Sequence, residues 1–331
     1  MLEIFNRFKK IYYLMLFMIG VPVNLVAIVI LSRGKCGLSS GTTHYLVAMA
    51  ASDLLSIITE VFLWRISYYY FPGSFLDITP VCSVILVLSR ASTNSSVWFT
   101  VAFTFDRFVA ICCQKLKVKY CTKRTAIVVL GTTGCLLFVK NIPWYFTLKS
   151  WTIIDNVPWG CYNKPGYYSE PGWVGFDWFD TVLTPLLPFA LILLFNALTV
   201  RHIIVASRVR EGLKKKGNTD NRNDPEMESR RRSIILLFAL SGSFILLWMV
   251  YVLYFIYYTI TGKDRSDFNE SENIFRQAGT LLLNLNCCIN TFVYVVTQSK
   301  FRDQLRDAVK YPIVSFVQWC NSSCERMIQK P

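Results

Sequence analysis

Four charged side chains stand inside or at the end of long apolar stretches of this 331-residue chain: Asp53, Arg90, Asp106 and Arg107. A charge placed in an apolar environment is costly, so such residues usually serve a function, such as binding a ligand or an ion or switching between states. No pattern indicates covalent chemistry. The chain has two histidines, which are far apart, and it lacks the motifs of metalloproteases, serine hydrolases and phosphate loops. We therefore expect a binding or signalling protein, and no enzyme.

The elements that must position these charges are membrane spans. The chain is 53% hydrophobic and 17% charged, whereas about a quarter of the residues of a soluble domain are charged. About 20 apolar residues are enough to cross a bilayer, and runs of this kind begin near Ile11, His44, Val81, Ala126, Phe176, Ile234 and Ile274. The sequence predicts an all-α membrane protein, a seven-transmembrane helix bundle over residues 11–297.

The basic residues indicate how the bundle is oriented, because cytoplasmic connections retain Lys and Arg. Roughly 23 of them fall in the first, third and fifth connections and the tail, against about 8 on the other side. We therefore expect residues 1–10 to be extracellular and residues 298–331 to be cytoplasmic, the latter beginning with a short amphipathic helix over Lys300–Arg306. Anionic inner-leaflet lipids would attract the basic loops. A nucleic-acid partner has no support, since no aromatic-rich soluble module is present.

The cysteines differ in the side of the membrane on which they are expected to lie. Of eleven cysteines, only Cys82 and Cys161 fall on the outer side, where thiols oxidise, and we expect them to form a disulfide; two free thiols are the alternative. Asn269 begins the one glycosylation sequon expected outside. Cys320 and Cys324 lie in a basic tail near the membrane, so they are candidates for palmitoylation or plain cytosolic thiols.

Polar residues also cluster in the second and third apolar runs. Asp53 should face the bundle interior, and Ser92 and Ser96 are four residues apart, so they share a helix face. These hydroxyls could ligate whatever Asp53 attracts. The alternative is that each hydroxyl bonds to its own backbone.

These residues together resemble one family, the class A, or rhodopsin-like, G-protein-coupled receptors. The resemblance covers nearly the whole chain, and it rests on several motifs in the correct order on seven predicted spans. The matching positions are Asn24, Asp53, Cys82, Asp106-Arg107-Phe108, Pro188, Phe244 with Trp248, and Asn290 with Tyr294.

The resemblance implies a plasma-membrane receptor that couples an extracellular ligand to a heterotrimeric G protein. It assigns signal transfer to Asp106, Arg107, Phe108, Asn196, Asn290 and Tyr294, and the activation switch to Phe244 and Trp248. It also implies a sodium pocket, because an oxygen-rich site with one carboxylate suits a hard cation. An interhelical polar network without an ion is the alternative. The residues of this pocket would be Asp53, Ser92, Ser96, Asn286 and Asn290, with Na⁺ held at Asp53 and Ser96.

The ligand site should open to the outside above Trp248. Ser89 stands where amine receptors carry an aspartate, so a monoamine ligand is not expected. Arg90 is too deep to reach the membrane surface easily: it either binds a ligand carboxylate, for which its planar guanidinium is suited, or pairs with an internal acid. The expected ligand contacts are Ser89, Arg90, Asp180, Glu60, Trp248, Tyr251 and Phe255, with Asp180 and Glu60 as the candidate counter-ions of Arg90.

A narrower resemblance concerns the ligand. The segments 45–55, 96–111 together with 142–144, and 282–294 are similar to an orphan subgroup thought to sense tryptophan, phenylalanine or related peptides. This resemblance implies an aromatic amino acid or short peptide as ligand.

The chain also departs from the family pattern. Val250 and Thr291 replace prolines of the sixth and seventh helices, Asn196 replaces a tyrosine, and Arg230 stands at the base of the sixth helix where an acidic residue sometimes occurs, with Glu228 two residues away. Prolines kink helices. A receptor-like protein that binds without efficient signalling is therefore an alternative. A multi-pass transporter is less favoured, since no internal repeat is evident.

Overall fold

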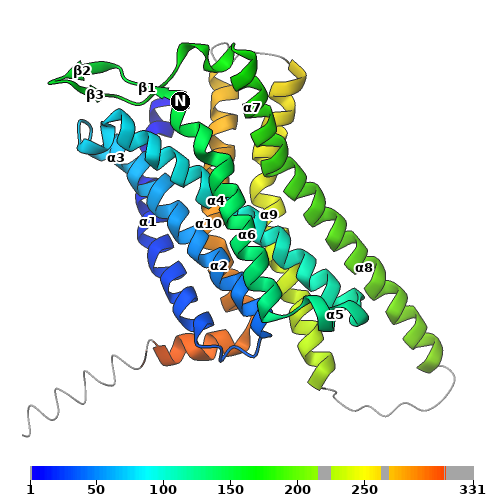
Figure 1. Ribbon diagram of the computed structural model, residues 1–331. Helices are drawn as coiled ribbons and strands as arrows, with labels where there is room; N and C mark the ends of the chain where they lie inside the picture. Colours follow the sequence, from blue (N-terminus) through cyan, green and yellow to red (C-terminus); the bar gives the residue numbers. More distant parts are fainter. Residues whose placement is uncertain (1, 215–224, 262–267, 309, 311–331) are drawn as a thin grey trace, which may run out of the picture.

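The computed structural model describes residues 2–214, 225–261, 268–308 and 310. Within these residues, seven helices are long and apolar enough to cross a membrane, and Figure 1 shows them side by side in one bundle. The prediction of seven spans is confirmed. The start of α1 lies at the same end of the bundle as the strands, and the short helix over residues 299–308 lies across the opposite end (Figure 1).

The first four spans occupy the chain up to residue 147. The first is α1 (Leu2–Ser32), and the second consists of α2 (Ser40–Ser56), a π-helical segment (Ile57–Ile66) and α3 (Ser67–Tyr70). The third span is α4 (Thr79–Cys112), which is followed by the short α5 (Gln114–Tyr120). The fourth is α6 (Lys123–Asn141), extended by a 3₁₀ segment (Ile142–Thr147).

The last three spans begin at residue 171. The fifth is made of α7 (Pro171–Thr181), a segment Val182–Leu186 and α8 (Leu187–Lys214). Its helix is interrupted at Thr184, whose φ of −152° and ψ of 105° are not helical. The sixth is α9 (Pro225–Thr261) and the seventh is α10 (Glu270–Thr297).

Four short strands connect the fourth and fifth spans. β1 (Leu148–Lys149) pairs antiparallel with β4 (Tyr162–Asn163), and β2 (Thr152–Ile154) pairs antiparallel with β3 (Val157–Trp159). Figure 1 shows the β2–β3 hairpin projecting beyond the bundle. The disulfide between Cys82 and Cys161, with 6.4 Å between the Cα atoms, ties this connection to the start of α4. The predicted disulfide is confirmed.

The largest buried apolar cluster lies toward the end of the bundle that carries α5. Leu46, Met49, Phe103 and Tyr294 from α2, α4 and α10 meet there and are fully or almost fully buried. Phe301 of the helix at residues 299–308 joins the cluster, and its ring centroid lies 5.8 Å from that of Tyr294. On that helix Phe301 is buried while Arg302, Asp303, Arg306 and Asp307 are exposed, which confirms the predicted amphipathic helix.

Two helices begin before the apolar runs from which they were predicted. α1 begins at Leu2, so residues 2–10, expected as an extracellular terminus, continue the first helix. An Arg7 to Glu3 ion pair of 3.0 Å, one turn apart, supports that end. α9 begins at Pro225, well before the apolar run near Ile234. The length of an apolar run indicates only the part of a helix that lies in lipid. The helix itself can continue beyond that part into water.

The positions without the family's prolines lie inside continuous helices. Val250 is within α9 and Thr291 is within α10. In α9 the hydroxyls of Ser241 and Ser243 donate to the carbonyl oxygens of Leu237 (2.7 Å) and Leu240 (2.9 Å). Bonds of this kind bend helices slightly, so these serines can bend α9 about two turns before Val250.

Candidate functional site

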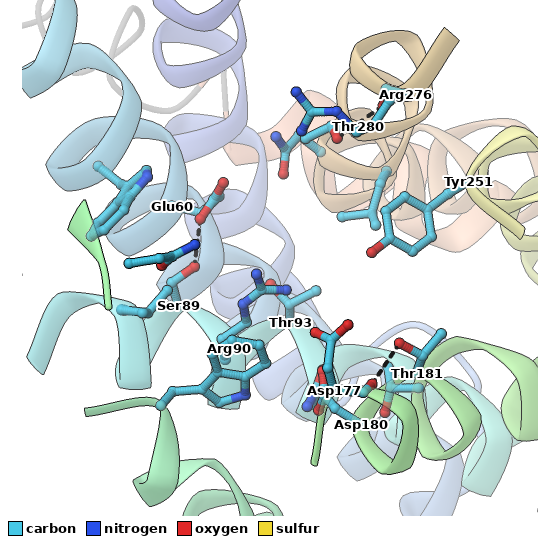
Figure 2. Close-up of a pocket in the computed structure, with 18 of the residues that line it drawn as sticks. Glu60, Ser89, Arg90, Thr93, Asp177, Asp180, Thr181, Tyr251, Arg276 and Thr280 are labelled. Atoms are coloured by element: carbon cyan, nitrogen blue, oxygen red, sulfur yellow. Dashed lines mark hydrogen bonds between the residues drawn. The ribbon is translucent and has the colours of Figure 1, made fainter. Parts of the chain in front are cut away.

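A cavity of about 470 Å³ lies at the end of the bundle that holds the disulfide. Its walls come from the π-helical segment, α4, α7, α9, α10 and the strand-bearing connection, and Figure 2 shows polar side chains entering it from these elements. All of the expected ligand contacts line this cavity: Glu60, Ser89, Arg90, Asp180, Trp248, Tyr251 and Phe255.

Glu60 is held by two neighbours on one wall of the cavity. Its Oε1 accepts hydrogen bonds from Nε (2.8 Å) and Nη2 (2.6 Å) of Arg65, and its Oε2 accepts one from Ser89 Oγ (2.7 Å). Residues five apart are brought together by π-helical geometry, in which backbone bonds join i and i+5. The π-helical segment therefore places Arg65 against Glu60.

Arg90 lines the cavity and forms no ion pair among the described residues. Lys140, at the end of α6, donates to Asp180 Oδ1, and Arg65 forms an ion pair with Glu60. Of the two alternatives for Arg90, the ion pair with Asp180 or Glu60 is not formed, because Lys140 and Arg65 pair with these acids. A ligand carboxylate as the partner of Arg90 stays a prediction. The guanidinium carbon of Arg90 lies 4.6 Å from the ring centroid of Trp144 instead, a cation–π geometry.

Aromatic side chains form the inner end of the cavity. Trp248 is 2% exposed, stacks on Phe244 with 5.3 Å between ring centroids and meets Tyr251 edge-on at 6.3 Å. Phe255 meets Trp178 edge-on at 5.4 Å. The predicted switch pair, Phe244 and Trp248, is therefore in direct contact with the cavity wall. The indole Nε1 groups of Trp248 and Trp144 are buried without a hydrogen-bond partner.

Several lining residues were missed by sequence reasoning. Arg276 enters from α10, Arg65 from the π-helical segment, and Asp177 from α7, where its Oδ1 accepts a hydrogen bond of 2.9 Å from Tyr167 Oη. Arg276 did carry a usable signal, since it is a cation near the start of an apolar run that begins at Ile274. The other two became visible only when the helices were assembled.

The second site surrounds Arg107 at the opposite end of the bundle. Its Nε donates to Asp106 Oδ2 (3.0 Å), its Nη2 donates to the same oxygen, and its Nη1 donates to Ser233 Oγ (3.2 Å). Asp106 and Arg107 are 6% and 7% exposed. The structure thus links α4 to α9 through Ser233, which sequence reasoning missed; the side chains of Arg230 and Glu228 lie outside the described residues.

A cavity of about 870 Å³ opens beside Arg107. Lys117, Arg232 and Lys300 also line it, together with Cys121. Burial, reinforced by the negative charge of Asp106, raises the pKa of the Cys121 thiol to about 11, so this thiol is neutral at physiological pH. The cavity is therefore lined by cationic and neutral groups within the described part of the chain.

The remaining signal-transfer residues fall into separate groups. Phe108 stacks on Phe195, with 5.7 Å between ring centroids, and the neighbouring Asn196 has a buried Oδ1 without a partner. Tyr294 is fully buried against Phe301. The structure therefore brings Arg107 together with Asp106, and it does not place Tyr294 in hydrogen-bond contact with Arg107.

The polar group around Asp53 joins three helices. Asp53 is fully buried; its Oδ1 accepts from Ser96 Oγ, and its Oδ2 accepts from Asn290 Nδ2 at 2.8 Å. Ser92 instead donates to the carbonyl oxygen of Ser89 at 3.0 Å, so the backbone alternative holds for this residue. Asn286, one turn before Asn290, has a buried Oδ1 without a partner.

The modification sites differ in what the structure describes. Asn269 caps α10: its Oδ1 accepts from Glu272 N at 2.8 Å, and Glu272 Oε2 accepts from Asn269 N at 2.9 Å. The sequon residue therefore has a structural role, and its glycosylation stays a prediction. Cys320 and Cys324 lie outside the described residues.

Seven helices long enough to span a membrane, a disulfide and a cavity at one end of the bundle and an acid–arginine pair at the other end define a membrane receptor. Residues 23–294 match the model of the 7 transmembrane receptor (rhodopsin family), and the chain belongs to this family. It is a multi-pass protein of the plasma membrane that couples an extracellular ligand to a G protein. The proteins similar to it are receptors and not enzymes.

The similar proteins are distant. The C-C chemokine receptor type 1 of Macaca fascicularis is 23% identical over 312 residues, which cover 93% of this chain and 81% of the relative. The FMRFamide receptor of Drosophila melanogaster is 22% identical over 298 residues, or 86% of this chain and 50% of the relative. The probable G-protein coupled receptor 142 of Mus musculus is 24% identical over 307 residues, or 90% and 72%.

Proposed function

We propose that this receptor binds an aromatic amino acid or a short peptide in the cavity above Trp248 and responds by activating a heterotrimeric G protein at the Arg107 end. The observation that carries the ligand class is the composition of the cavity. Trp248, Tyr251 and Phe255 form an aromatic wall, and Arg90 lines the same cavity without an ion pair among the described residues.

These groups suit the two parts of such a ligand. An aromatic ring packs well against Trp248 and Tyr251, since offset and edge-on aromatic contacts are favourable. A carboxylate forms two parallel hydrogen bonds with a guanidinium, and the contact with Trp144 orients that of Arg90. The cavity of about 470 Å³ is within the size range of small-molecule sites.

The link to the G protein is argued from the contacts of Trp248 and Arg107. Trp248 lines the ligand cavity and stacks on Phe244 in α9, and the same helix holds Arg107 through Ser233. A ligand that displaces Trp248 therefore acts on the helix that restrains Arg107. The alternative, a receptor-like protein that binds without efficient signalling, is supported by the continuity of α9 through Val250.

The test is a screen of aromatic amino acids and short peptides against membranes that contain the receptor, with nucleotide exchange on several G-protein classes as the readout. We expect exchange to rise with at least one aromatic carboxylate, and to be lost in Arg107→Ala at equal surface expression. Ligands that bind the purified receptor without raising exchange would favour the binding-only alternative. If neither binding nor exchange is found for any aromatic carboxylate, the proposed ligand class is wrong.

We also propose that Asp53 and Ser96 hold a sodium ion. The carboxylate, the Ser96 hydroxyl and the unpartnered Oδ1 of Asn286 provide the oxygen ligands that a hard cation prefers. A polar network without an ion, closed by Asn290, remains the alternative. An ion there would join α2, α4 and α10 and stabilise the bundle.

A further inference from the structure

Two guanidinium groups enter the ligand cavity without an acidic partner among the described residues. Arg90 belongs to α4 and Arg276 to α10, and Figure 2 shows them on opposite sides of the cavity. The ion pairs of this region are Arg65 with Glu60 and Lys140 with Asp180. Neither Arg90 nor Arg276 takes part in them.

The acids that line the cavity are engaged elsewhere. Both carboxylate oxygens of Glu60 accept hydrogen bonds, from Arg65 and Ser89. Asp180 accepts from Lys140, and Asp177 accepts from the hydroxyl of Tyr167. Each of these acids therefore accepts its hydrogen bonds from residues other than Arg90 and Arg276.

The charged groups that line the cavity are equal in number but unevenly paired, and further cations lie around them. Three guanidinium groups and three carboxylates line it, and Lys140 adds a fourth cation through its pair with Asp180. Lys9 also lies close enough to both Arg65 and Arg276 for like charges to interact. The described residues therefore leave an excess of positive charge around this space.

Arg90 and Arg276 form no ion pair with the described residues, although Arg90 is close enough to Glu60 for the two charges to attract. Arg90 lies against the neutral ring of Trp144. Thr280, one turn from Arg276, donates its hydroxyl hydrogen to the backbone carbonyl oxygen of Arg276 at 3.2 Å. A charge in a confined site is costly unless it is paired, so each of the two guanidinium groups favours an anion in the cavity.

We propose that the ligand of this receptor carries two separated anionic groups, one bound by Arg90 and the other by Arg276, with an aromatic group between them against Trp248 and Tyr251. The chemical class is an aromatic dicarboxylate, such as an acylated aromatic amino acid or a short peptide with an acidic side chain. The inference rests on the proposed function, whose ligand it narrows from one carboxylate to two.

The first experiment compares matched probes on the purified full-length receptor. N-succinyl-L-phenylalanine carries two carboxylates, whereas N-butyryl-L-phenylalanine has the same chain length and carries one; N-glutaryl- and N-pentanoyl-L-phenylalanine form a second pair with a longer spacing. Affinity is measured by calorimetry. We expect the dicarboxylate to bind about tenfold or more tightly in at least one pair, since charge-assisted bonds to Arg are strong. Equal affinities within both pairs, or no binding of either dicarboxylate, would overturn the inference.

Variants then identify which side chain binds the second carboxylate. Arg276→Gln should abolish the preference for the dicarboxylate while the affinity for the monocarboxylate stays the same. Arg90→Gln should weaken both probes. Lys149→Gln, which removes an exposed cation from β1, should change neither. Arg276→Lys, which keeps the charge, should retain part of the preference. It is the control that distinguishes loss of the charge from a folding defect in Arg276→Gln. A preference that survives in both Arg90→Gln and Arg276→Gln contradicts the assignment.

These experiments distinguish a failure of the proposed ligand binding from a failure of the proposed signalling. A dicarboxylate that binds through Arg90 and Arg276 but does not raise nucleotide exchange supports the inference and contradicts the proposed signalling. Exchange driven by a monocarboxylate whose affinity does not depend on Arg276 supports the signalling and overturns the second anionic contact.

Discussion

At the scale of single residues, Arg107 is restrained by two partners of different kinds. Asp106, its neighbour in sequence, takes two of its N–H groups, and Ser233 takes the third across the gap to α9. The bond to Asp106 lies within one helix and would survive a movement of α9. The bond to Ser233 would not, so Ser233 is the part of the restraint that senses the position of α9.

Replacing Ser233 by Ala should therefore raise basal signalling. A hydrogen bond to a charged group contributes about 1.5–3 kcal/mol, and since about 1.4 kcal/mol is a factor of ten, its loss should increase ligand-independent nucleotide exchange by about tenfold or more. Ser233→Thr keeps the hydroxyl and serves as the control. Exchange in Ser233→Ala that equals that of the wild type would show that this bond does not restrain the receptor.

A second residue-scale prediction concerns Asp53. If sodium binds the carboxylate, the purified receptor should melt at a higher temperature in sodium chloride than in choline chloride at equal ionic strength. Asp53→Asn keeps the size of the side chain and should abolish this difference, because it removes the charge that attracts the cation. A wild-type melting temperature that is equal in the two salts favours the network without an ion.

At the scale of elements, α9 and α10 pack unusually closely beside the ligand cavity. A Cβ added to Gly279 of α10 would lie 3.1 Å from Cα and 3.2 Å from N of Tyr251 in α9. These are backbone atoms, so neither helix can relieve the contact by turning a side chain. Gly279 thus sets the distance between the two helices at the level of Tyr251, which lines the cavity.

Gly279→Ala should consequently destabilise the receptor even though alanine favours helices. Overpacking typically costs about 1–3 kcal/mol, which we expect to exceed the gain in helix propensity and to lower the melting temperature. Gly242→Ala in α9 is the matched control, because a Cβ there meets nothing within 4 Å. If the two variants melt at the same temperature, close packing at Gly279 does not contribute to stability.

At the scale of the whole molecule, charge should decide which end of the bundle faces the cell interior. The end that carries α5 and the helix at residues 299–308 bears Lys115, Lys117, Lys119, Lys300 and Arg302. The other end carries the disulfide, which forms in an oxidising compartment. Both observations favour an extracellular N-terminus, with the ligand cavity open to the outside.

An epitope tag placed before Met1 should accordingly be stained on intact cells, and a tag after Pro331 only after the cells are permeabilised. The positive-inside bias and the outer disulfide both require this result. A C-terminal tag that is stained on intact cells would reverse the orientation and, with it, the assignment of the two cavities.

The sequence alone determined those features that depend on a single helix or on the compartment in which a residue lies. The seven spans follow from hydrophobic length, and the adjacency of Asp106 and Arg107 is local to one helix. The Cys82–Cys161 disulfide follows from which cysteines lie outside. The residues expected around the ligand all line one cavity, and their contact with a ligand stays a prediction.

Only the tertiary structure decided which side chains are partners. Lys140 reaches Asp180 from 40 positions away, and Ser233 reaches Arg107 from 126. Such pairs depend on the rotation and relative height of whole helices, which hydrophobic pattern leaves open. For the same reason the sequence showed that Arg90 is costly to bury, whereas only the assembled bundle showed that its expected acids are taken and that Arg276 faces it across the cavity.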